Sequence, residues 1–103
     1  MKLALTAEMI DAKTAVTMGL INQIYPTDDI LGDAIEMACS IGELAPLAIK
    51  ASKQMMLEGL SARDIQSAFA GRYSAFEAML ASDDAKEGPR AFIEKRPPKW
   101  SGK

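Results

Sequence analysis

Paired carboxylates are the first candidates for chemistry in this sequence of 103 residues. Asp28 and Asp29 form one pair, and Asp83, Asp84 and Glu87 form a denser acidic group. Carboxylates that lie close together shift each other's pKa values, which allows one to act as a general acid and the other as a general base. Both groups also lie at predicted helix starts, where acidic side chains cap free N–H groups and interact favourably with the helix dipole. We therefore interpret them as capping residues and assign no catalysis to them.

Other nucleophiles and metal ligands are scarce. The sequence contains no histidine, so it lacks the usual general base, the commonest metal ligand and any Ser-His or Cys-His pair. Its one cysteine, Cys39, follows Ala38 on an apolar stripe and is predicted to be a buried, inert thiol. We predict no catalytic residue, no metal site and no resident cofactor.

The C-terminal residues 86–103 carry an uneven charge. They contain six basic and two acidic residues, a net charge of +4, whereas the whole chain carries −2. This basic segment could bind a phosphate-bearing ligand, with Phe76 and Phe92 against a nucleotide base and the ammonium of Lys95 on the phosphate. Basic residues late in a helix also interact favourably with its negative end, and phenylalanine commonly packs in a core. From the residues alone, a solvated basic face and core packing are the simpler interpretation.

Helix start and stop signals predict an all-α chain that positions these residues. Gly88 and Pro89 predict a kink in the last helix, and Trp100 is a large aromatic anchor in a polar tail. Ser61 and Asp64 resemble a capping box before the long helix, which has the clearest apolar periodicity. The expected elements are a short helix from Asp11 to Gly19, an extended segment near residues 20–25, a helix from Thr27, Asp28 and Asp29 to Gly42, a helix from Pro46 to Gly59, a long helix from Ser61 to about Ala81, and a final helix from Ser82 to Pro97.

Composition is that of one ordinary globular domain, residues 1–103. Hydrophobic residues make up 49% and charged residues 25% of the chain, so a core can form with a thin margin of stability. The net charge of −2 argues against nucleic acid or an acidic membrane surface as a general partner. No apolar run is long enough for a signal peptide or a membrane span, and a single cysteine suits a reducing compartment, so we expect a cytoplasmic protein.

Four stretches resemble the C-terminal helical region of the enoyl-CoA hydratase/isomerase (crotonase) family. LTAEMIDA followed by MGLINQI, residues 5–12 and 18–24, is similar to the family passage "LTG, IDA, then GLVN", with Ala7 where glycine is usual. APLA with Lys53 resembles the "AP-A, then K" helix, and SDDAKEG resembles the "S-D-EG" turn. AFIEKRPP, residues 91–98, resembles the terminal "AF-EKR-P" signature. The matches keep their order over essentially the whole chain.

The resemblance implies a helical C-terminal domain without the N-terminal spiral ββα core of the crotonase fold. In that family the core supplies the backbone amides of the oxyanion hole and the acidic residues that move protons. No residues of this sequence match those groups. Oxyanion donors are typically worth a few kcal/mol each, so we expect no turnover of CoA thioesters by this chain alone.

The resemblance also implies a role in ligand binding and assembly. Phe76 and Phe92 match aromatic positions near the CoA adenine, and Lys95 matches a position that meets the ribose phosphate. The expected partners are CoA or acyl-CoA, a crotonase core chain, and further copies in a dimer, trimer or higher assembly. Pro89 stands where relatives have an aliphatic residue and bears on the placement of Phe92 and Lys95. The alternatives are a helical interaction protein that no longer binds CoA and, less favoured by the missing histidine, an independent hydratase.

Overall fold

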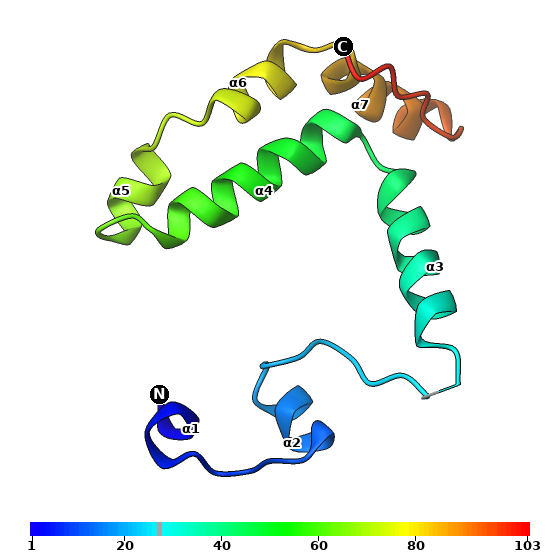
Figure 1. Ribbon diagram of the computed structural model, residues 1–103. Coiled ribbons are helices and arrows are strands. Elements are labelled where there is room, and N and C mark those ends of the chain that lie inside the picture. Colours follow the sequence, from blue (N-terminus) through cyan, green and yellow to red (C-terminus); the bar gives the residue numbers. More distant parts are fainter. Residues whose placement is uncertain (27) are drawn as a thin grey trace. The chain divides into compact units, whose positions relative to one another are not determined.

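The computed structural model describes residues 1–26 and 28–103 and contains only helices as regular structure in these ranges (Figure 1). The predicted all-α fold is confirmed. Thr27, one of the expected capping residues, lies outside the described residues. The helices are α1 (Lys2–Thr6), α2 (Ala12–Thr17), α3 (Ile30–Gly42), α4 (Pro46–Leu60), α5 (Ile65–Ala70), α6 (Ser74–Ala81) and α7 (Asp84–Glu94).

The chain divides into two compact units, Met1–Met37 and Ala38–Lys103. In the first unit, α2 begins as its sequence predicts, because the Asp11 carboxylate accepts a hydrogen bond of 2.7 Å from the N–H of Thr14. Gly19 follows α2 in the left-handed conformation at φ 71°, which suits a glycine after a helix. Residues 20–25 form no helix.

Ala7 ends α1 in a conformation that favours glycine. Its φ is 51° and its N–H donates to the Leu3 carbonyl at 3.0 Å, so it closes the helix in the left-handed region. A Cβ atom in this region crowds the neighbouring carbonyl oxygen. The glycine usual at this position in the related passage would avoid that contact.

Replacing Ala7 by glycine is therefore expected to stabilise α1 and its unit. The strain relieved exceeds the extra chain entropy of glycine, for a net gain of about 1 kcal/mol in the free energy of unfolding. Urea unfolding followed by circular dichroism would measure it. A loss of stability on substitution would contradict the left-handed assignment of Ala7.

In the second unit, α4 packs mainly against α6 and also contacts α5, while α6 contacts α7 (Figure 1). Pro46 occupies the first turn of α4 as predicted. The buried residues Ala51 of α4 and Ala75 of α6 are small, which lets helices approach closely. Gln54 of α4 accepts a hydrogen bond of 2.8 Å from the N–H of Ala75, so α4 satisfies a free donor in the first turn of α6.

The predicted long helix is wrong, because it divides into α5 and α6. Gly71 is extended, and the Tyr73 hydroxyl turns back to donate to the Ala68 carbonyl at 2.6 Å. A side chain on Gly71 would lie 2.8 Å from the Tyr73 ring, so glycine is needed where the ring crosses the chain. The predicted Ser61 cap is also wrong: Asp64 caps α5 by accepting from the N–H of Ser67 at 2.7 Å.

The apolar stripe of α3 is not covered within the described structure, where the helix has no buried residue. Cys39 is consequently exposed, and the prediction of a buried thiol is wrong. An apolar stripe in the sequence predicts burial, but burial also requires a partner surface against the stripe.

Candidate ligand-binding site

The acidic group at the start of α7 holds the C-terminal tail. Asp84, which is only 5% exposed, accepts hydrogen bonds from the N–H groups of Ser101 at 2.7 Å and Gly102 at 2.9 Å. The N–H of Ser101 makes the largest contribution to lowering the pKa of Asp84. The N–H of Asp83 donates to the Lys103 carbonyl at 2.8 Å. Asp83 and Asp84 are not arranged as a pair of general acid and general base. Asp84 binds the tail instead of capping its own helix.

Arg96 joins the end of α7 to its middle. Its Nη1 and Nη2 donate to the two oxygens of Glu87 at 2.6 and 3.0 Å, and its Nε donates to Glu94 at 2.6 Å. The N–H of Lys99 reaches the same Glu87 carboxylate at 2.8 Å. Arg96 and then the Lys99 N–H lower the pKa of Glu87 to about 2, and Glu87 in turn raises the pKa of Arg96. We call Glu87, Glu94 and Arg96 the arginine clasp.

The clasp is expected to make the stability of the chain depend on pH in the acid range. Since the folded-state pKa of Glu87 is about 2 and its ordinary value is 4.5, ionised Glu87 stabilises the fold fully above pH 4.5. That stabilisation is lost as the pH falls toward 2. Thermal unfolding at pH 7, 4 and 2.5 should show a Tm difference between the wild type and Glu87→Gln that shrinks on acidification. A difference that is constant over this range would rule out this titration.

Trp100 also anchors the tail, as its sequence predicts. Its Nε1 donates to the Glu43 carbonyl at 3.0 Å, and its ring lies over Gly88, where a Cβ would be 3.4 Å away. The ring also borders an apolar groove of about 790 Å³ along α4, lined by residues such as Ala48 and Met56. Thus the "S-D-EG" and "AF-EKR-P" stretches and the tail contact one another and form one structural assembly.

Two of the three predicted site residues share one turn. Phe92 lies on α7 with 86% of its surface exposed, so the expectation of core packing is wrong for this ring. Lys95 follows α7 at φ 52°, and its N–H donates to the Phe92 carbonyl at 3.2 Å. Exposed Lys95 and exposed Phe92 therefore present a cation and an aromatic ring from the same helix end.

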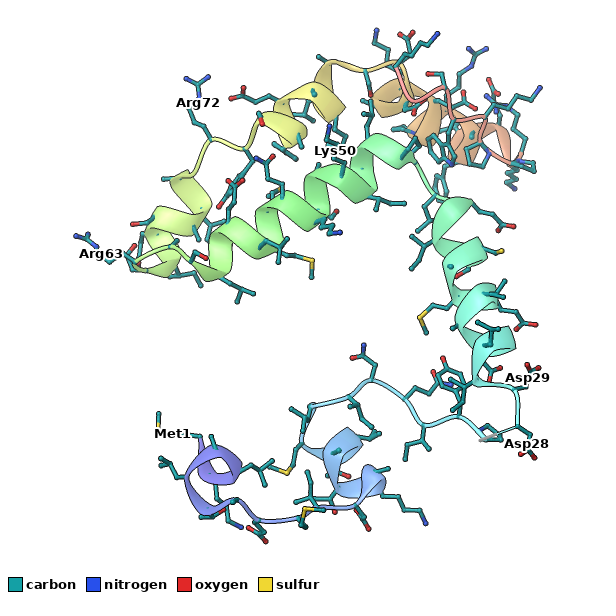
Figure 2. All side chains as sticks on the ribbon, viewed as in Figure 1. Met1, Asp28, Asp29, Lys50, Arg63 and Arg72 are labelled. Atoms are coloured by element: carbon teal, nitrogen blue, oxygen red, sulfur yellow. The ribbon has the colours of Figure 1, made fainter. Side chains whose placement is uncertain are left out.

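Phe76 is placed elsewhere in the unit. It lies on α6, is 36% exposed, and lines an apolar cavity of about 260 Å³ with Met55, Phe69 and Tyr73. The described contacts join Phe76 to neither Phe92 nor Lys95. The cationic residues Arg63 and Arg72, on either side of α5, extend outward from this end of the unit (Figure 2).

The described residues offer neither a metal site nor a membrane-spanning helix. Three or more cysteine, aspartate or glutamate side chains do not come together as a possible metal site anywhere in the described structure. None of the helices in this part of the chain combines the length and apolar character needed to cross a membrane.

The arginine clasp is the feature that the sequence interpretation missed. The nine-residue separation of Glu87 and Arg96 gives no local signal, because the chain must reverse after α7 to join them.

Comparison with known proteins identifies the family to which this chain belongs. All residues 1–103 match the family model described as enoyl-CoA hydratase/isomerase. The chain is 31% identical over 102 residues to the 2,3-dehydroadipyl-CoA hydratase of Escherichia coli K12, covering 99% of this chain and 40% of that protein. It is 37% identical over 95 residues to the short-chain-enoyl-CoA hydratase of Clostridium acetobutylicum, covering 92% of this chain and 36% of that protein. The chain belongs to the enoyl-CoA hydratase/isomerase family and spans about 40% of the length of the curated relatives it matches.

Solved structures agree with this assignment. An enoyl-CoA hydratase/isomerase from Mycobacterium paratuberculosis superposes with a TM-score of 0.87 at 36% identity, over 99% of this chain and 41% of that one. An enoyl-CoA hydratase from Mycobacterium tuberculosis H37Rv gives a TM-score of 0.82 at 34% identity, over 99% and 40% of the two chains. The helical arrangement described above is therefore that of part of a crotonase-fold chain.

Proposed function

We propose that this chain is the C-terminal helical region of an enoyl-CoA hydratase/isomerase, where it covers the acyl-CoA site and takes part in self-association. The observation that carries the proposal is the match of the whole chain to a family whose members it spans only in part. The order of the motifs from "LTG" to "AF-EKR-P" supports the C-terminal position. The relatives act on CoA thioesters according to their names, which supports the same ligand class here.

The reaction centre belongs to the rest of the protein in this proposal. Hydration or isomerisation of an enoyl thioester needs preorganised donors to the thioester oxygen and a positioned acid or base. Two carboxylates of the acidic group at the start of α7 are already engaged, because Asp84 binds the tail and Glu87 binds Arg96. The chain alone is therefore expected to turn over no enoyl-CoA, and its contribution is to binding.

Ligand binding is assigned to Phe92 and Lys95, with Phe76 contributing from α6. An aromatic ring stacks on a purine, and an exposed ammonium pairs with a phosphate. The exposure of both Phe92 and Lys95 on one turn supports this assignment. The cavity beside Phe76 supports a separate, apolar contact with the ligand.

Self-association is supported by the amount of apolar surface that the second unit leaves open. Large side chains on several of its helices are mostly exposed, including Leu60, Phe69 and Ile93. Such surfaces mark contacts with other chains or with other parts of the same protein. A further copy and a crotonase core chain are the partners we propose, in a cytoplasmic setting consistent with a single cysteine.

Calorimetric titration of CoA at low and moderate salt tests the binding role. We expect binding that weakens as salt rises, because an exposed phosphate pair is screened. Light scattering on the same sample tests assembly, and a monodisperse monomer would contradict self-association. Absence of heat at both salt concentrations would overturn CoA binding by this chain.

A second candidate function is that of a helical interaction protein that binds no CoA. The groove along α4 beside Trp100 favours it, since an exposed apolar groove is a surface on which a protein partner can dock. This candidate predicts self-association without CoA binding. The two measurements above therefore separate it from the first proposal.

A further inference from the structure

The end of α7 is a Schellman motif with lysine where glycine is usual. The N–H of Arg96 donates to the Ala91 carbonyl at 3.1 Å and the N–H of Lys95 to the Phe92 carbonyl at 3.2 Å. These are the two hydrogen bonds that define the motif, with Lys95 at the left-handed position. At this position the Cβ of lysine crowds the neighbouring carbonyl oxygen, a contact that glycine would avoid.

Two unfavourable features thus lie on one turn. Lys95 holds a conformation that its side chain disfavours, and Phe92 exposes an aromatic ring to water. Strained backbone in proteins persists where surrounding contacts impose it, and it concentrates at ligand sites. The residue directly after Lys95 is Arg96, and its side chain makes contacts of this kind.

The arginine clasp fixes this turn from its C-terminal side. Arg96 is half-buried and makes paired hydrogen bonds to Glu87, nine residues earlier in the chain, and another to Glu94 directly before Lys95. A bidentate pair of this kind restrains orientation as well as distance. Glu94 and Arg96 are the residues directly before and after Lys95, so the hydrogen bond between their side chains restrains the backbone on both sides of Lys95. The hydrogen bonds and ion pairs of the described residues do not include the Lys95 ammonium, which leaves it available to a ligand.

We propose that Arg96, held by Glu87 and Glu94, is a positioning residue that keeps Lys95 in its left-handed conformation and so fixes the ammonium relative to Phe92 for the ribose phosphate of CoA. This inference rests on the proposed function. It differs from a merely structural role of the clasp in a measurable way. Loss of positioning weakens recognition of that one phosphate, whereas loss of structure weakens binding of every part of the ligand.

The test compares the affinities of CoA and 3′-dephospho-CoA for the full chain by calorimetry. Their ratio reports the phosphate contact, and an exposed ion pair gives a ratio of about fivefold in the wild type. Glu87→Gln keeps Lys95 and makes the site more positive, so simple charge attraction would raise the ratio. Loss of positioning lowers it, to near the value of Lys95→Ala, with the affinity for dephospho-CoA kept within about twofold.

The matched control is Glu77→Gln, which removes the exposed ion pair with Arg72 at 3.1 Å on α6 and makes the same change of charge. This variant should keep the wild-type ratio. If circular dichroism shows that Glu87→Gln does not fold, Glu94→Gln takes its place, because it removes one contact of Arg96 and leaves the bidentate pair with Glu87.

The outcomes separate the two levels of the proposal. A ratio in Glu87→Gln that equals or exceeds the wild-type ratio, while Lys95→Ala lowers it, overturns the positioning role and leaves the CoA site standing. A ratio that Lys95→Ala does not lower, or absence of CoA binding by the wild type, overturns the binding role of Lys95 and the positioning role with it.

Discussion

Replacing Tyr73 by alanine is expected to destabilise the unit Ala38–Lys103 by about 3 kcal/mol, since removal of a buried aromatic side chain loses both its apolar transfer energy and its packing. Tyr73 is 8% exposed and is the largest of the buried residues. Its ring packs against Gly71, and its hydroxyl binds the Ala68 carbonyl at the end of α5. Urea unfolding followed by circular dichroism would measure the loss.

The control for this variant is Tyr73→Phe, which keeps the ring and removes the hydroxyl. It should lose about 1 kcal/mol, the usual net contribution of one hydrogen bond. If both variants were as stable as the wild type, the contacts of Tyr73 would not explain the break between α5 and α6.

Replacing Lys95 by glutamate is expected to weaken CoA binding at least tenfold at low salt. The substitution replaces an attraction to phosphate by a repulsion, and the two effects together exceed about 1.4 kcal/mol, which is a factor of ten. Self-association should be unchanged, because the substitution alters one exposed side chain at a helix end. Calorimetry gives the affinity, and light scattering gives the assembly state.

Lys86→Glu is the matched control on the same helix. Nine residues separate Lys86 from Lys95, or about 13 Å of helix, which exceeds the screening length of about 8 to 10 Å at ordinary salt. It should weaken CoA binding less than threefold. Equal losses in the two variants would point to general attraction by the basic segment, and equal affinity of Lys95→Glu and wild type would exclude Lys95 from the site.

Much of the fold follows from local signals. Asp11 caps α2 and Pro46 opens α4 because their side chains act on neighbouring backbone groups, which a sequence reveals directly. The break at Gly71 could not be predicted in this way. Residues on both sides keep helical periodicity, and the break depends on the Tyr73 ring crossing the chain and on Gln54 of α4 binding the first turn of α6.

The candidate site was only partly predictable for a similar reason. The resemblance to the family named Phe92 and Lys95, and these residues do lie on one turn with Lys95 left-handed. The arginine clasp requires the tail to fold back beside α7, so the charges of Glu87 and Arg96 appeared in the sequence as a solvated pattern. Cys39 shows the opposite error, because an apolar stripe indicated burial and the described structure leaves it exposed.

The most direct test of the CoA-binding role is a titration of CoA into the isotope-labelled chain, followed by the amide signals in nuclear magnetic resonance spectra. The CoA-binding role predicts saturable shifts that concentrate at residues 91–96 and at Phe76, with smaller shifts in the same places for Lys95→Glu. Shifts confined to other residues, or spectra that CoA leaves unchanged, would contradict it.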